Sequence, residues 1–168
     1  VARFLEENAS RDVMDVSREN MAQVCDTPER RAFMKKLAQR GWLGITWPRE
    51  HGGQDGSGIY EYLLNEMLSA VGAPGIGKGV GIVGKTLINV GSDKLKQEFL
   101  PKILNAEIEF AVGYSEPGAG SDSAAMRLKA ERSGEGYRIN GEKWFVTTAN
   151  LADFLFLQAT LTNGPHAG

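Results

Sequence analysis

The spacing of apolar residues changes near Glu109, and this change limits the folds open to a chain of 168 residues. Before Glu109, apolar side chains recur every three to four positions, which is the period of an amphipathic helix. After Glu109 they alternate with polar ones, as in half-buried strands. Helices followed by a run of strands predict an α+β protein, because a parallel α/β sheet would alternate the two. We therefore expect an all-helical N-terminal domain over residues 1–108 and a β domain over residues 109–168.

Four helices are predicted in the first part from capping residues and apolar faces. The best marked begins after Thr27, a good N-cap followed by Pro28, and ends near Gly41. The other three cover residues 59–71, 80–90 and 93–100. Pro101 follows the last of them, and we expect it to open a turn because proline interrupts helical hydrogen bonding.

The strands of the second part are predicted to form an antiparallel meander. They cover residues 110–115, 127–132, 137–139, 143–148 and 154–161. Gly134-Glu135-Gly136 turns the chain between the second and third strands. Asn140-Gly141 is a strong signal for a two-residue hairpin, so the third and fourth strands are expected to pair through it.

Charge and composition exclude several classes of protein. The formal net charge is −2 and no basic stripe is present, so nucleic acid is not an expected partner. The longest weakly polar run contains Lys78 and Lys85 and is rich in glycine, so we expect no membrane span. The single cysteine, Cys25, cannot form an internal disulfide, which fits a reducing compartment. His, Cys, Asp and Glu do not cluster at metal-ligand spacing, so no metal is expected.

A phosphate-binding motif occurs within the third predicted helix. Residues 79–86, Gly-Val-Gly-Ile-Val-Gly-Lys-Thr, match both G-x-x-x-x-G-K-T and G-x-G-x-x-G. A P-loop follows a buried strand that aims it, and the glycine-rich and proline-containing residues 73–78 do not read as such a strand. We therefore interpret the glycines as positions where a buried helix comes close to its neighbours, and a P-loop NTPase is a distant alternative.

Residues 110–122 carry the strongest chemical signal. Their sequence, Phe-Ala-Val-Gly-Tyr-Ser-Glu-Pro-Gly-Ala-Gly-Ser-Asp, leads from an apolar strand into a turn rich in glycine, serine and aspartate. Such a turn offers backbone N–H groups and hydroxyls beside a rigid strand, which suits a flat, partly anionic ligand. A flexible surface linker has a similar composition, so this segment alone leaves both interpretations open.

Three motifs, in the same order and spacing, resemble those of the acyl-CoA dehydrogenase family. Residues 115–122 resemble its Thr/Ser-Glu-Pro-x-Ala-Gly-Ser-Asp signature, and residues 140–147 resemble its second flavin segment, Asn-Gly-x-Lys-x-aromatic-Ile/Val-Thr. Residues 91–103 resemble a Gly-Ser…Leu-Pro helix pair of the family. The resemblance runs from about Arg30 onward. It implies that residues 109–168 begin an antiparallel β-barrel domain, truncated here, with the C-terminal helical domain absent.

The resemblance implies FAD as the cofactor and suggests which residues hold it. The expected cofactor contacts are Val112, Tyr114, Ser115, Gly120, Ser121, Phe145, Val146 and Thr147. In the family, the first strand bonds the pyrimidine edge of the flavin, and the serine of Gly-Ser-Asp lies near the pyrophosphate and the acyl-CoA. Ser121 is therefore also the expected substrate contact. The aromatic residue and threonine of the second segment approach the dimethylbenzene side and N5. We expect Ser115 and Thr147 to lie side by side.

The implied reaction is FAD-dependent α,β-dehydrogenation of an acyl-CoA thioester in fatty acid metabolism. The resemblance also implies an electron-transferring flavoprotein as partner and a homodimer or homotetramer, in the cytoplasm or, in a eukaryote, the mitochondrial matrix. Glu116 is interpreted as a turn residue, and the catalytic base is expected beyond Gly168, so this segment alone is expected to be inactive. A flavin oxidase or monooxygenase on the same scaffold, and a non-catalytic assembly subunit, are the alternatives.

Overall fold

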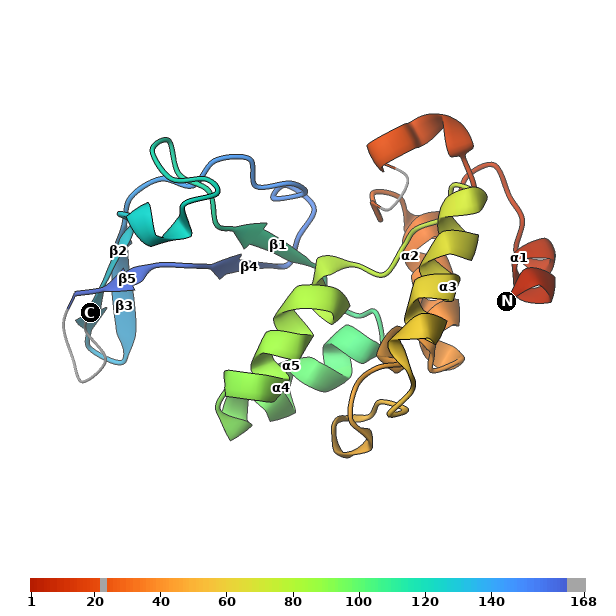
Figure 1. Ribbon diagram of the computed structural model, residues 1–168, viewed down its shortest axis with the longest axis horizontal. Helices are drawn as coiled ribbons and strands as arrows, with labels where there is room; N and C mark the ends of the chain where they lie inside the picture. Colours follow the sequence, from red (N-terminus) through yellow and green to blue (C-terminus); the bar gives the residue numbers. More distant parts are fainter. Residues whose placement is uncertain (22–23, 163–168) are drawn as a thin grey trace. The chain divides into compact units, whose positions relative to one another are not determined.

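A computed structural model describes residues 1–21 and 24–162 (Figure 1). The chain divides into two compact units, Val1–Glu109 and Phe110–Gly168. The first is built from helices and the second from short strands and turns. An α+β arrangement with the helices first is therefore confirmed. None of the described helices is long and apolar enough to cross a membrane.

The described residues of the helical unit form five α-helices, connected by loops and short 3₁₀ or π-helical turns. The α-helices are α1 (Ala2–Glu7), α2 (Pro28–Gln39), α3 (Gly58–Ala70), α4 (Lys85–Val90) and α5 (Asp93–Leu104). Short 3₁₀ helices occupy Val16–Met21, Trp42–Gly44 and Arg49–His51, and a π-helix, Gly79–Gly84, precedes α4.

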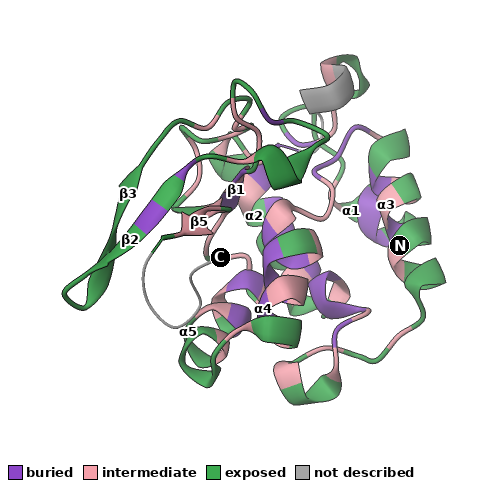
Figure 2. Ribbon diagram, turned by 60° about the vertical axis from the view of Figure 1, so that its left-hand side comes forward, coloured by how far each residue is buried: buried purple, intermediate pink, exposed green. Residues whose placement is uncertain are grey.

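Helix α2 starts and stops where its sequence predicts. The Thr27 hydroxyl accepts the backbone N–H of Arg30 at 3.2 Å, and Pro28 occupies the first helical position. Gly41 follows the helix with a φ of 71°, a left-handed conformation that glycine adopts without steric strain. The buried face of α2, coloured purple in Figure 2, includes Phe33 and Leu37.

Arg30 is a charged side chain buried inside the helical unit. Its Nε donates to the carbonyl of Val24 at 2.8 Å, and its Nη1 donates to the carbonyls of Val13 and Gly72. Asp26 Oδ1 lies 3.9 Å from Arg30 Nε. Burial is the main cause that lowers the pKa of Arg30 from its ordinary value. The guanidinium therefore joins the segments before α2 and after α3 through their backbone oxygens.

The phosphate-binding motif forms the π-helix and the first turn of α4. No strand precedes it in the described part of the chain. A methyl group at Gly84 would overlap the ring atoms Cζ2 and Cη2 of Trp47, whose Nε1 donates to the carbonyl of Val80 at 3.3 Å. The Lys85 ammonium pairs with Glu61 at 2.9 Å. The interpretation of these glycines as close-packing positions is therefore confirmed at Gly84, but not at Gly81, where an added methyl meets nothing within 4 Å.

Helix α5 continues past the point where the sequence predicts its end. It runs through Pro101 to Leu104, so the turn expected at Pro101 is wrong. Proline removes one backbone hydrogen bond from a helix interior. Leu100 and Ile103, on either side of it, are both buried. The burial of their apolar surface offsets the lost bond and keeps the last turn helical.

The described strands of the second unit form two small sheets. Strand β1 (Phe110–Gly113) pairs in parallel with β4 (Phe154–Leu157). Strand β2 (Lys129–Ser133) pairs antiparallel with β3 (Gly136–Asn140) and parallel with β5 (Thr160–Leu161). The expected antiparallel meander is therefore wrong, since only the β2–β3 pair is antiparallel among the described strands. These strands do not close into a barrel.

The hairpin of this unit lies one turn earlier than the stronger sequence signal indicates. The chain reverses at Gly134, with a φ of 63°, between β2 and β3. The hairpin predicted at Asn140-Gly141 is wrong, because β3 ends at Asn140 and residues 143–148 form no strand. Figure 2 shows β3 exposed along its length, so no apolar face on β3 draws another strand onto it. The following residues are held by β1 instead.

Candidate functional site

The end of β1 meets the segment that follows β3. The Trp144 backbone N–H donates to the carbonyl of Ser115 at 2.8 Å. The Lys143 Nζ donates to the carbonyl of Tyr114 at 2.8 Å. Figure 1 shows the chain between β3 and β4 passing beside β1. The two segments that carry the predicted flavin motifs are thus brought together, although the second is a loop and not a strand. The contact falls at Trp144, three residues before Thr147.

Ser115 offers hydrogen-bond donors at this junction. Its residue is half-buried, and neither its backbone N–H nor its hydroxyl has a hydrogen-bond partner among the described residues. These donors are therefore available to a ligand at the half-buried end of the strand. Tyr114 is exposed beside it, with its ring edge-on to Phe156 at 6.2 Å. Val112 lies within β1 itself and is half-buried.

Glu116 is fully engaged by the protein. Its Oε2 accepts the backbone N–H of Arg127 at 2.7 Å, and its Oε1 accepts that of Leu128 at 2.9 Å. Lys143 Nζ lies 2.9 Å from the same Oε1. The side chain of Lys143 is only 5% exposed and that of Glu116 only 7%. The lysine first, and the backbone donors after it, lower the pKa of Glu116 from 4.5 to about 2. Its interpretation as a structural turn residue is confirmed.

The turn after Glu116 is open to solvent. Gly120 and Ser121 are both exposed, and neither forms a hydrogen bond with the described residues. A methyl group added at Gly118 or Gly120 would meet nothing within 4 Å. The packing of the protein therefore does not require glycine at these two positions. The space beside the turn is free for a ligand.

Residues 145–148 adopt a compact, strained turn. Phe145 has a φ of 55° and Thr148 a φ of 67°, left-handed conformations that are costly for an aromatic and a β-branched residue. Thr147 N–H bonds the carbonyl of Phe145 at 2.9 Å, and the Phe145 side chain is 85% exposed. Val146 is half-buried and Thr147 exposed. Strain of this kind concentrates at ligand sites and switch regions.

Sequence reasoning missed Lys143 as a member of the site. Its position within Asn-Gly-x-Lys was noted only as part of a motif, whereas the structure places its side chain under the end of β1. The stem of the lysine passes beside Gly113. A methyl group at Gly113 would be in ordinary contact with Lys143 Cγ at 3.4 Å, but it would overlap Leu157 Cδ2 at 2.7 Å. The sequence contains no signal that Glu116 has a buried lysine as its partner.

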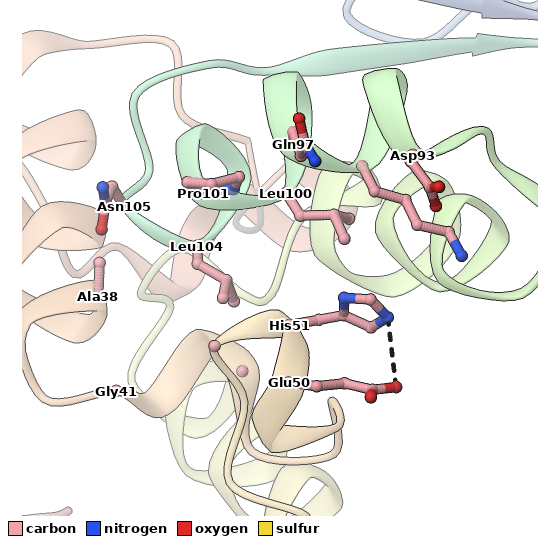
Figure 3. A pocket seen from close by; sticks show the side chains of 13 residues that line it. Ala38, Gly41, Glu50, His51, Asp93, Gln97, Leu100, Pro101, Leu104 and Asn105 are labelled. Carbon is pink, nitrogen blue, oxygen red and sulfur yellow. Dashed lines mark ion pairs between the residues drawn. The ribbon is translucent and has the colours of Figure 1, made fainter.

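The helical unit contains a separate cavity of about 650 Å³. Figure 3 shows Leu100 and Leu104 of α5 facing His51 across it. His51 Nε2 lies 3.7 Å from Glu50 Oε1. None of the eight predicted cofactor contacts lines this cavity. In the described ranges, no three His, Cys, Asp or Glu side chains gather as metal ligands would.

Comparison with known proteins covers nearly the whole chain. Residues 1–107 match the profile of "Acyl-CoA dehydrogenase, N-terminal domain", and residues 111–168 match "Acyl-CoA dehydrogenase, middle domain". The chain is 36% identical over 138 residues to acyl-CoA dehydrogenase FadE26 of Mycobacterium tuberculosis, covering 82% of this chain and 34% of that protein. It is 36% identical over 163 residues to the mitochondrial isovaleryl-CoA dehydrogenase of Pongo abelii, covering 95% of this chain and 37% of that protein.

Solved structures give the same result. The Tcur3481-Tcur3483 steroid ACAD is similar with a TM-score of 0.80 and 34% identity, over 99% of this chain and 43% of that one. The ChsE4-ChsE5 complex from Mycobacterium tuberculosis has a TM-score of 0.79 and 28% identity, over 97% and 42%. An electron transferring flavoprotein of Acidaminococcus fermentans has a TM-score of 0.65 and 29% identity, over 91% and 40%. The chain spans roughly a third of the length of the first two relatives, 34% and 37%.

Proposed function

Because this chain belongs to the acyl-CoA dehydrogenase family, whose members are oxidoreductases, we propose that it forms part of an FAD-dependent enzyme that dehydrogenates an acyl-CoA thioester between Cα and Cβ. One observation carries the proposal. The end of β1 is hydrogen-bonded to Lys143 and Trp144, and the donors of Ser115 have no partner there among the described residues.

The residues at the junction fit a flavin. We propose that Val112, Tyr114 and Ser115 hold the pyrimidine edge, with the N–H and hydroxyl of Ser115 as donors. We propose that Gly120 and Ser121 lie beside the pyrophosphate and the acyl-CoA, where the turn leaves open space. The remaining contacts are proposed for the second segment: Phe145, Val146 and Thr147. When bound, FAD supplies the acceptor for the two electrons and the hydrogen removed from Cβ.

Each side chain then has a defined task. Fixed donors at Ser115 stabilise negative charge that develops on the flavin edge during reduction, and they do so without reorganising. The exposed ring of Phe145 is positioned to cover a ligand and exclude water. The hydroxyl of Thr147 is a donor for the flavin ring. Ser121 orients the thioester substrate.

Glu116 does not take the α proton in this account. Its carboxylate is already bonded to two backbone N–H groups and to Lys143, and its lowered pKa makes it a poor base. We propose that a carboxylate outside these 168 residues removes the proton, and that this segment alone is inactive. We also propose that residues 109–168 begin a β-barrel completed outside this segment.

The acceptor, assembly and compartment are proposed from the family. We propose an electron-transferring flavoprotein as the partner that takes electrons from the reduced enzyme. A homodimer or homotetramer is proposed for the assembly; one similar structure is named as a complex. We propose the cytoplasm, or the mitochondrial matrix in a eukaryote, as the compartment.

The experiment is to purify the complete encoded protein and measure its flavin content and its anaerobic bleaching by a set of acyl-CoA thioesters. We expect FAD at one per chain, bleaching by at least one thioester, and reoxidation by an electron-transferring flavoprotein. Rapid reoxidation by oxygen instead would indicate a flavin oxidase or monooxygenase. A colourless protein that binds no added FAD would leave an assembly subunit and overturn the proposal. The 168-residue chain, assayed in parallel, is expected to show no turnover.

A further inference from the structure

We propose that Lys143 is a positioning residue for the flavin, which, together with Glu116, fixes the direction in which the Ser115 backbone N–H points. The inference rests on the proposed function, because it concerns the same site. Neither side chain is among the expected cofactor contacts. Both lie behind the strand end that is proposed to touch the ligand.

The geometry of the peptide unit makes this connection. The carbonyl of Tyr114 and the N–H of Ser115 belong to one peptide group, which is trans like every described peptide bond. In a trans peptide the carbonyl and the N–H point in opposite directions. Lys143 Nζ bonds that carbonyl at 2.8 Å. The Ser115 N–H therefore points away from the lysine and is left free of any partner among the described residues.

The next carbonyl is held in the same way. Trp144 N–H bonds the carbonyl of Ser115 at 2.8 Å. Two consecutive residues, Lys143 and Trp144, thus donate hydrogen bonds to two consecutive carbonyls at the end of β1. A donor held on both sides needs no reorganisation when a ligand oxygen arrives, and this is what makes fixed donors effective.

A charged side chain in this almost dry location requires a partner of opposite charge. Lys143 is 5% exposed, and a buried ammonium group needs an anion and satisfied donors. Glu116 supplies the anion at 2.9 Å. The carboxylate is in turn fixed by the backbone N–H groups of Arg127 and Leu128. The network therefore ties the end of β1, the start of β2 and the second flavin segment to one another.

A purely structural role for Lys143 and Glu116 and a role in positioning the Ser115 N–H predict different effects of mutation on FAD affinity. Removing Lys143 alone leaves the Glu116 carboxylate without its counter-ion in a nearly buried place, which destabilises the fold whatever the function. Removing both charges avoids that penalty. The Tyr114 carbonyl still loses its donor in the double variant, so ligand binding and stability are separated.

The test uses four versions of the complete encoded protein: wild type, Lys143→Met, the double variant Glu116→Gln/Lys143→Met, and Lys129→Met as a control at an exposed lysine of β2. For each, FAD affinity is measured by fluorescence titration of the apoprotein, and the midpoint of thermal unfolding is measured without FAD. We expect Lys143→Met to lower both quantities. We expect the double variant to regain much of the unfolding midpoint while binding FAD about tenfold or more weakly than wild type, the loss typical of one well-placed hydrogen bond.

Two results would overturn the inference. One is a folded double variant that binds FAD as tightly as wild type. The other is a loss of FAD affinity that equals that of Lys129→Met. A wild-type protein that binds no FAD contradicts the proposed function itself, and this outcome is visible before any variant is compared. If Lys143→Met fails to fold, the double variant and the control still decide the matter.

Discussion

Replacing Gly84 with alanine should destabilise the helical unit, whereas the same change at Gly81 should not. Both glycines belong to the π-helix and to the motif that matches a P-loop. The new methyl at Gly84 would overlap the ring of Trp47, which is only 1% exposed and is further held by its bond to the Val80 carbonyl. At Gly81 the methyl meets nothing within 4 Å.

The magnitude follows from two opposing effects. Overpacking a rigid core site costs about 1–3 kcal/mol, and the buried ring places Gly84→Ala at the upper end, about 3 kcal/mol. Alanine in place of glycine in a helix stabilises by about 1 kcal/mol at either position, and this is the whole effect expected for Gly81→Ala. The two variants should therefore differ by the overpacking cost alone, about 3 kcal/mol, or on the order of 100-fold in the unfolding equilibrium constant.

Urea denaturation followed by far-ultraviolet circular dichroism measures this difference, because the helical signal comes from the first unit. Equal midpoints for the two variants would refute the packing argument. If ATP and magnesium instead raise the unfolding midpoint of the wild type and not that of either variant, that result would show that the motif binds phosphate.

Three further predictions concern charged and ionisable groups. The pKa of the Glu116 carboxylate in the folded protein is about 2, below its ordinary 4.5. The stability that this carboxylate contributes is therefore present above pH 4.5 and is lost as the pH falls towards 2, and Glu116→Gln should remove this pH dependence from a profile of unfolding midpoint against pH. Arg30→Met should cost about 2 kcal/mol or more in the free energy of unfolding, because the carbonyls of Val13 and Val24 lose their donor in a buried place; an unchanged denaturation midpoint would contradict this. Burial raises the pKa of Cys25 from 9.0 to about 12, so the fraction of thiolate at pH 8 should be on the order of 1,000-fold smaller than for an ordinary cysteine. Alkylation of Cys25 by iodoacetamide should therefore be slow in the folded protein and fast in urea.

Features that depend on local chemistry could be predicted from the sequence. Thr27, Pro28 and Gly41 mark α2 because capping is decided within one turn of the chain. The turn at Gly134 is local in the same sense. Pro101 shows the limit of such reasoning: its local effect is to end a helix, yet buried neighbours contributed by the rest of the unit keep α5 helical.

The candidate site was predictable only in part. Ser115 stands out through its motif, and the structure brings its strand to the second motif at Trp144. The loop at residues 143–148 was expected to be a strand, since its residues suit one. The bond from Lys143 to Glu116, 27 positions away, overrides that preference, and no periodicity reveals a pairing between residues so far apart. The same holds for Gly84, whose requirement depends on where Trp47 packs.

Hydrogen exchange at the Ser115 backbone amide, read residue by residue with and without FAD in the complete protein, tests most directly whether this strand end holds a flavin. The N–H has no partner among the described residues, so it should exchange quickly in the apoprotein. Bound FAD should slow it markedly, together with the amides of residues 145–147. Tight FAD binding with the Ser115 amide still exchanging at its apoprotein rate would contradict the account.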